Sequence, residues 1–339
     1  YDRAFRVQAN PQDSDFYKFT QQLEGSYYHS LRKGDLGFQY GPKTIRFVTK
    51  SPQGKWFTAA TFQGDFENAW GRSLSPNGEE FAFFINRGGV IKESSSRIIV
   101  TDGRTNSQQM LELPEKGRLW KSVSFTESQF TPKTGRILSG TDEGHVSIWT
   151  KDALGKYQEQ RFPEKHAQRI TDLTITENED TIVTKSEDGV IKIWKVTETG
   201  AFKKDSEIYA EKNRYGYMGA ELSPDQRVLV TASGDEWGGV FLRGQDGKWS
   251  FKEKIVGSPG LIRFSPNSQM FTTVSGRELI LWQIRPNLPV KRIPLYRGKY
   301  LDSVRFSPDG KQLITMITMD YVGLEHFYDL ENLPPLPER

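Results

Sequence analysis

A repeated alternation of apolar and polar residues is the main pattern along the chain. Ser139–Trp149 and Thr184–Trp194 align without gaps: each has a stretch of small or β-branched residues, an acidic turn containing Gly, and an alternating segment that ends in Trp. Thr272–Trp282 is a third copy, and Thr231–Leu242 is a fourth that ends in Leu. Alternation with a period of two is typical of a half-buried strand. Each copy therefore predicts two strands joined by a tight turn.

A second motif, an apolar residue followed by Ser, Pro and Asn or Asp, lies upstream of these copies. In this motif Pro fixes φ, whereas Asn, Asp and Gly tolerate the positive φ that tight turns use. Between two alternating segments, such a turn predicts a hairpin. The motif occurs at Leu74–Gly78, Leu222–Asp225, Phe264–Asn267 and Phe306–Gly310.

The two motifs together define a unit of four antiparallel strands. The ends of the predicted third strands recur about every 46 residues, close to the length of a β-propeller blade. The sequence therefore predicts an all-β propeller with seven blades, and six blades remain an alternative. These ends are placed at Val48, Val100, Trp149, Trp194, Leu242, Trp282 and Phe327.

The combination of Ser-Pro-Asp-Gly with Thr/Ser-x-Ser-x-Asp-Gly-x-Ile-x-Ile-Trp resembles the WD40 repeat, most strongly over residues 118–330. The Trp-Asp dipeptide of that family is absent, since Thr150, Lys195 and Gln283 follow the tryptophans. The resemblance implies a fold that binds other proteins through its loops and acts as a non-catalytic scaffold or sensor.

In this family a His, a Ser or Thr, an Asp and the Trp form a structural hydrogen-bonded set. One repeat of the chain holds all four residue types, at His166, Thr184 or Ser186, Asp188 and Trp194. Aromatic residues at the strand ends are expected to pack in the core.

The N-terminal region fits the repeat less well. Ser51–Trp56 is interpreted as the turn between a third and a fourth strand, so that the first two strands would come from about residues 24–40. The preceding residues predict a helix that starts near Phe16 and reaches Leu31. The expected organisation is a helical or irregular N-terminal extension over residues 1–35, the propeller over 36–332 and a Pro-rich tail over 333–339.

Two alternatives concern the same region. The N-terminal stretch could instead complete the last blade. It also faintly resembles the segment before the propeller sensors of bacterial signalling NTPases of the STAND class. That resemblance, and the first residue Tyr1, predict a fragment of a larger signalling protein. A missing effector domain would then contact the propeller.

Composition narrows the function classes. The 339 residues contain no Cys, which excludes a disulfide scaffold and a thiolate metal site. No apolar run is long enough to span a membrane, and 8 Trp, 13 Tyr and 21 Phe argue against global disorder. The absence of Cys fits a reducing compartment, so a cytoplasmic protein is expected. A net charge of +3 gives little support to a nucleic-acid partner.

The family resemblance implies that two sets of loops share one face. The loops between blades are rich in cationic and aromatic residues, the types common at interface hot spots. The second set is acidic, at Asp142–Glu143, Glu187–Asp188 and Asp235–Glu236. We expect this face to bind a protein or peptide with acidic groups, although the cations could instead pair with the acidic loops. The candidate partner-binding residues are Arg118, Trp120, Lys165, Arg169, Arg214, Tyr215, Tyr217, Trp237, Arg297, Lys299 and Tyr300.

No motif predicts catalysis. His29, His145, His166 and His326 lack metal-ligand spacing, and there is neither a Gly-x-Ser-x-Gly elbow nor a phosphate-binding loop. We therefore expect no catalytic residues, no bound metal and no cofactor. A propeller enzyme with a site in its central channel and a structural assembly unit remain alternatives.

Overall fold

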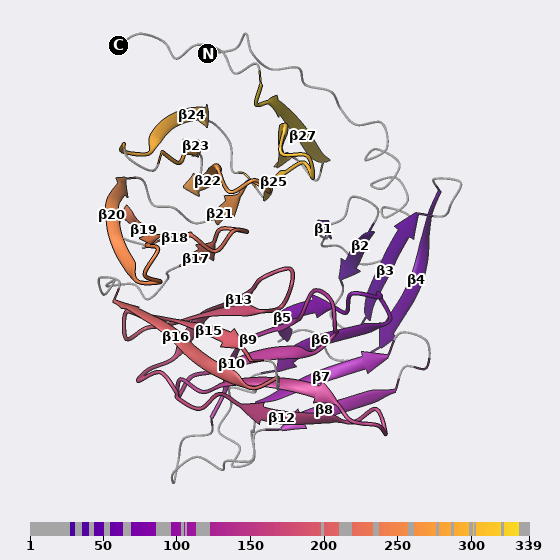
Figure 1. Cartoon of the computed structure of the whole chain (residues 1–339). Helices are drawn as coiled ribbons and strands as arrows, with labels where there is room; N and C mark the ends of the chain where they lie inside the picture. Colours follow the sequence, from indigo (N-terminus) through magenta and orange to yellow (C-terminus); the bar gives the residue numbers. More distant parts are fainter. Residues whose placement is uncertain are drawn as a thin grey trace. The chain divides into compact units, whose positions relative to one another are not determined.

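The chain divides into two compact units, one of residues 12–179 and one of residues 180–339 together with 1–11. The computed structural model describes residues 28–30, 36–40, 44–50, 55–63, 69–85, 96–102, 105, 107–112, 123–197, 200–209, 219–232, 237–256, 261–275, 278–285, 288–297, 301, 303–319 and 322–331. All regular elements within these ranges are strands (Figure 1). No helix able to cross a bilayer occurs among them.

The unit of residues 12–179 holds three antiparallel sheets, each ordered as in the sequence, and the first strand of a fourth. The first sheet is β1 (Tyr28–Ser30), β2 (Leu36–Tyr40), β3 (Thr44–Lys50) and β4 (Trp56–Gln63). The second sheet is β5 (Ala69–Leu74), β6 (Glu80–Ile85), β7 (Arg97–Asp102) and β8 (Gln108–Glu112). The third is β9 (Phe125–Phe130), β10 (Ile137–Thr141), β11 (Val146–Lys151) and β12 (Tyr157–Arg161), and the fourth begins with β13 (Ile170–Ile175).

The unit of residues 180–339 continues the series. The fourth sheet is completed by β14 (Thr181–Ser186), β15 (Val190–Val196) and β16 (Phe202–Tyr209). The fifth is β17 (Ala220–Leu222), β18 (Val228–Thr231), β19 (Trp237–Arg243) and β20 (Trp249–Val256). The sixth is β21 (Leu261–Phe264), β22 (Met270–Ser275), β23 (Glu278–Gln283) and β24 (Lys291–Arg297). The seventh sheet, as far as the structure describes it, is β25 (Ser303–Phe306), β26 (Gln312–Met319) and β27 (Val322–Asp329).

The hydrophobic core of each unit lies between successive sheets, because alternate residues of each strand point to opposite faces. One cluster joins Ala82 and Ile98 of the second sheet to Phe125, Ile137 and Trp149 of the third. The first strands of neighbouring sheets also contact one another: β9 contacts β5 and β13, and β21 contacts β17 and β25. From the second sheet onward, each described sheet therefore packs against the next one along the chain.

The predicted repeats coincide with the second and third strands of four sheets. The four aligned copies form β10–β11, β14–β15, β18–β19 and β22–β23. Trp149, Trp194 and Trp282 are at most 5% exposed, which confirms that they pack in the core. The pairing of β3 with β4 confirms the interpretation of the segment that begins at Ser51.

Two details of the prediction are corrected. The helix predicted to reach Leu31 does not do so, since Tyr28–Ser30 pairs with Gly37–Gln39 as β1 and β2; its earlier residues lie outside the described ranges. In the seventh sheet, Leu313 pairs with Tyr328, as Ile137 pairs with Trp149. Tyr328, and not Phe327, is thus the counterpart of the tryptophans. The domain boundaries and the number of blades stay predictions.

Candidate partner-binding surface

Two kinds of connection meet at one end of the third sheet: the β10–β11 turn (residues 142–145) and the loop 162–169, which leads to the fourth sheet. The backbone N–H of His166 donates to the carbonyl of Gly144, at 2.9 Å. Gly144 has a φ of +85°, and a Cβ there would lie 2.3 Å from the carbonyl oxygen of His166. Only glycine therefore fits where the turn and the loop touch.

The segment that enters the third sheet meets the same turn. The N–H of Ser124 donates to the Asp142 carboxylate at 2.9 Å. The N–H of Asp142 donates a hydrogen bond to the carbonyl of Ser124, also at 2.9 Å. At this end of the third sheet, the β10–β11 turn thus contacts both Ser124, which directly precedes β9, and the loop 162–169. This confirms, for this unit, the shared face that the family resemblance implied.

The structure places four of the predicted partner-binding residues. Lys165 and Arg169 are exposed on the loop 162–169. Arg297 is exposed at the end of β24, in the other unit. Trp237 begins β19 and pairs with Val256, but its side chain is not described. The other candidates lie outside the described residues: Arg118, Trp120, Arg214, Tyr215, Tyr217, Lys299 and Tyr300.

The acidic turns use carboxylates to hold the backbone. Asp142 accepts the amide of Ser124, as described above, and Asp188 accepts the amide of Val190 at 2.9 Å. These contacts fix the turn and the strand next to it. The carboxylate that interacts electrostatically with Arg169 is a different one, Glu127 of β9, which also interacts with Asp172 of β13.

Glu127 has an unusual protonation equilibrium. Burial raises the pKa of its carboxyl most, the negative charge of Asp172 raises it further, and Arg169 opposes both, giving a pKa of about 7. Because folding raises this pKa, ionisation of Glu127 lowers the stability of the fold as the pH rises from about 4.5 to about 7. Sequence reasoning missed this pair. The available signal was that each acid is the third residue of the first strand of its sheet.

Chemically, this end of the unit offers exposed cations next to half-buried carboxylates. Such a surface can bind charged groups of either sign by ion pairing and hydrogen bonding. Among the residues that the structure describes, no group of three or more His, Asp or Glu is placed to hold a metal ion.

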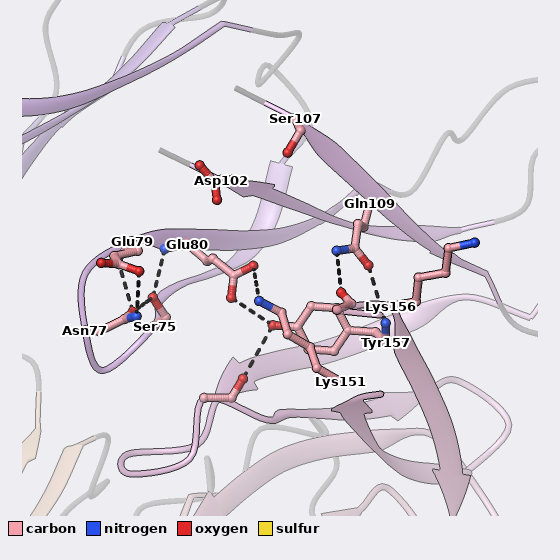
Figure 2. Close-up of polar contacts among 12 residues, drawn as sticks. Ser75, Asn77, Glu79, Glu80, Asp102, Ser107, Gln109, Lys151, Lys156 and Tyr157 are labelled. Carbon is pink, nitrogen blue, oxygen red and sulfur yellow. Dashed lines mark hydrogen bonds and ion pairs between the residues drawn. The ribbon is translucent and has the colours of Figure 1, made fainter. Parts of the chain in front are cut away.

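The opposite ends of the strands carry the first-hairpin turns, which join the first and second strands of a sheet (residues 75–79, 131–136, 176–180, 223–227, 265–269 and 307–311). In the turn of the second sheet, Ser75 Oγ donates to Asn77 Oδ1 at 2.7 Å and accepts the N–H of Glu80 at 2.8 Å (Figure 2). Ser223, Ser265 and Ser307 make the same pair of bonds in their own turns. These serines are at most 8% exposed.

The first-hairpin turns also bind one another. Glu179 has a φ of +62° and accepts hydrogen bonds from the preceding turn: the amides of Lys133 and Thr134, the Thr134 hydroxyl and the Arg136 guanidinium, at 2.7–2.9 Å. Gln226 and Ser268 occupy the same left-handed position in their turns. They bond to Asp180 at 2.8 Å and to the amide of Asp225 at 3.0 Å. This end is therefore occupied by contacts within the fold.

Cation–aromatic contacts reinforce the same end. Lys151 lies over the ring of Tyr157 and pairs with Glu80 of the second sheet at 2.7 Å, and the Tyr157 hydroxyl donates to Glu80 at 3.1 Å (Figure 2). The equivalent pair of the fifth sheet is Arg243 over Trp249, and the Arg243 guanidinium pairs with Asp205 of the fourth sheet at 2.8 Å.

Comparisons with known proteins agree with this architecture. The sequence model described as "WD domain, G-beta repeat" matches residues 158–195. The chain is 26% identical over 242 residues to the transcriptional corepressor LEUNIG_HOMOLOG of Arabidopsis thaliana, covering 70% of this chain and 28% of the corepressor. It therefore spans less than a third of that relative.

A solved structure shows the same fold. The crystal structure of a functionally unknown protein from Desulfotomaculum acetoxidans DSM 771 is similar with a TM-score of 0.55 and 14% identity, over 80% of this chain and 85% of that one. At this identity the likeness concerns the fold alone. The matched repeat, the succession of four-stranded antiparallel sheets and these likenesses support a WD40-like β-propeller fold for the chain.

Proposed function

We propose that the chain is a non-catalytic protein-interaction module, and that its partner binds the end of the strands that carries the loop 162–169. The observation that carries this proposal is the division of roles between the two ends. The first-hairpin turns are engaged with one another, whereas Lys165 and Arg169 are exposed on the loop at the other end. A propeller presents recognition groups on loops while its strands hold the core.

The partner we propose is a protein segment that carries acidic side chains. Lys165 and Arg169 supply the complementary charge. The matched WD repeat and the similarity to a transcriptional corepressor support a scaffold role. That the chain is one module of a larger signalling protein in the cytoplasm also belongs to this proposal.

The test uses a partner captured from cells with the full chain and then purified. The double variant Lys165→Glu/Arg169→Glu should weaken its binding at least about tenfold, because two attractive charges become repulsive. The affinity of the unaltered chain should also fall with added salt. Isothermal titration calorimetry measures both effects.

Lys133→Glu is the matched control. Lys133 is also exposed, but it lies in a first-hairpin turn at the other end of the strands. This variant should bind as the unaltered chain does. A loss of affinity for Lys133→Glu with none for the double variant would assign binding to the wrong end and refute the proposal.

A further inference from the structure

Asn77 and Gly78 form the single Asn-Gly dipeptide of the sequence. They lie in the β5–β6 turn, in which Figure 2 labels Asn77. Asn77 is exposed, and Gly78 has a φ of +73°. Glycine leaves its own backbone nitrogen unshielded because it has no side chain. This nitrogen can therefore attack the carboxamide of the preceding asparagine more readily than in other Asn-containing dipeptides.

In the folded turn, both the N–H of Gly78 and the carboxamide of Asn77 form hydrogen bonds. The N–H of Gly78 donates to the carbonyl of Ser75 at 2.9 Å. The Oδ1 of Asn77 accepts the Ser75 hydroxyl at 2.7 Å and the N–H of Glu79 at 3.2 Å, while its Nδ2 donates to the Glu79 carboxylate at 3.0 Å. The nitrogen of Gly78 can attack the Asn77 carboxamide only after these hydrogen bonds break. The reaction therefore requires that the turn opens.

We propose that Asn77 is a latent site of spontaneous deamidation, controlled by opening of the Ser75 turn. The nitrogen of Gly78 loses its proton and forms a bond to Cγ of Asn77. The Cγ–Nδ2 bond breaks and the nitrogen leaves as ammonia, which takes up the proton, so that a succinimide remains. Water then adds to one of the two succinimide carbonyls and cleaves its bond to nitrogen. The product is Asp or isoaspartate, and no oxidant or reductant takes part.

The two products fit the turn differently. Asp occupies the same place in two other first-hairpin turns, where Asp225 and Asp309 accept the hydroxyls of Ser223 and Ser307. An Asp at position 77 is therefore compatible with the turn. Isoaspartate instead adds a methylene group to the main chain and shifts the residues that follow it.

That shift reaches the contact between two sheets. Glu80, whose N–H bonds to Ser75 Oγ, carries the ion pair to Lys151 and accepts the Tyr157 hydroxyl (Figure 2). Isoaspartate at position 77 should therefore loosen the attachment of the second sheet to the third. The reactivity of Lys151 toward an amine-labelling reagent should rise in the isoaspartate fraction.

The test is peptide mapping by mass spectrometry of the purified full chain, aged at mildly alkaline pH with and without urea. Asn77 should deamidate in both samples, at least about tenfold more slowly in the folded chain. Ser75→Ala should raise the rate in the folded chain at least about tenfold, because it removes the two hydrogen bonds of the Ser75 hydroxyl. Gly78→Ser, which copies the Asn267–Ser268 turn, should suppress the reaction.

Asn267 is the internal reference. It makes the same bond to a serine hydroxyl, at 2.8 Å, but its neighbour Ser268 has a side chain, so Asn267 should stay intact. Equal rates of deamidation with and without urea would show that the turn does not control the reaction. If Asn77 is not deamidated in either sample, the proposal is wrong. If Ser75→Ala does not fold, Glu79→Ala deletes the Nδ2 contact at an exposed position and should give a smaller acceleration.

Discussion

At the scale of single residues, left-handed backbone positions determine how neighbouring sheets are joined. Glu179, Gln226 and Ser268 have φ values of +62°, +60° and +60°. This conformation costs a residue with a Cβ about 1–2 kcal/mol. Each of the three uses its side chain to bind the turn of the preceding sheet, which offsets that cost. Where glycine occupies the position, as at Gly135, an added Cβ would lie 3.7 Å from the ring of Pro76.

Glu179→Gln tests this role. Burial of the Glu179 carboxyl raises its pKa, but hydrogen bonds from Thr134, Arg136 and Lys133 outweigh burial and lower the pKa to about 2. Folding therefore favours the carboxylate. Its contribution is complete above the unfolded value of about 4.5 and is lost as the pH falls toward about 2. We expect Glu179→Gln to lower the free energy of unfolding by about 2 kcal/mol at pH 7, measured by urea denaturation.

The effect of Glu179→Gln should shrink as the pH falls from about 4.5 toward about 2, since the unaltered carboxylate then takes up a proton. Glu177→Gln is the matched control, because Glu177 is exposed in the same turn. It should change the stability by less than about 0.5 kcal/mol. An equal loss for both variants would mean that net charge, and not the turn-to-turn contact, is responsible.

The sequence predicted some residue roles better than others. The burial of Trp149, Trp194 and Trp282 followed from local alternation, since period two assigns each strand residue to a face. The pairing of Glu127 and Asp172 did not follow, because it depends on how β9 and β13 lie beside each other. The sequence assigned Asp142 and Asp188 to an acidic recognition set, but their carboxylates hold backbone amides.

At the scale of strands, a hydrogen bond recurs across the second and third strands of three sheets. The indole nitrogens of Trp149, Trp194 and Trp282 donate to Ser139, Thr184 and Thr273 at 2.8–2.9 Å. In the fifth sheet the register places Phe241, and not Leu242, where the tryptophans lie in the other sheets, and Thr231 occupies the hydroxyl position. Thr231 Oγ1 instead accepts the N–H of Gly239 at 3.0 Å. The hydroxyl at this position therefore has a hydrogen-bond partner in each of these four sheets.

A double-mutant cycle in the sixth sheet tests this interpretation. Trp282→Leu should lower the free energy of unfolding by about 3 kcal/mol, because it removes packing contacts and leaves the buried Thr273 hydroxyl without its indole hydrogen-bond partner. Adding Thr273→Val, which removes the hydroxyl left without its indole partner, should recover about 1 kcal/mol, although Thr273→Val alone is destabilising. Chemical denaturation of all four proteins measures the coupling. Simple additivity of the two changes would contradict the interpretation.

Elements with a complete local signal were predicted correctly. The β10–β11 and β14–β15 hairpins have alternation, turn residues and a terminal Trp together. The N-terminal prediction failed at its end because apolar residues spaced by four fit a helix as well as a short strand. Residues 28–30 form a strand because they pair with β2. This pairing is a contact between segments, so it cannot be predicted from the local spacing of apolar residues.

At the scale of the whole molecule, within each unit one end of the strands holds the fold together. The first-hairpin turns bind across sheets through side chains such as Glu179 and Gln226. The loop 162–169 contacts the β10–β11 turn through its backbone, while Lys165 and Arg169 remain exposed. Side chains of this loop can therefore change without removing that backbone contact, although Arg169 also interacts with Glu127 of β9.

Hydrogen–deuterium exchange with the captured partner tests this division. Binding should slow the exchange of amides in residues 162–169 and leave residues 131–136 unchanged, because the partner would cover only the first segment. The free chain provides the baseline for both peptides. Slower exchange confined to residues 131–136 would place the partner at the other end of the strands.

The chained turns also have a consequence for protein engineering. Since Glu179 reaches backward to residues 133–136, and Gln226 and Ser268 do the same one sheet further on, each of these turns has a fixed length. A tag or epitope inserted into one of these turns would lengthen the turn and would also disrupt its hydrogen bonds to the turn of the neighbouring sheet. The β11–β12 hairpin is more permissive, since Leu154 at its tip is 84% exposed. A fluorophore or affinity handle attached to the side chain at position 154 would point outward, whereas Gly155 and Tyr157 beside it bond to Gln109 of the second sheet and should keep their positions.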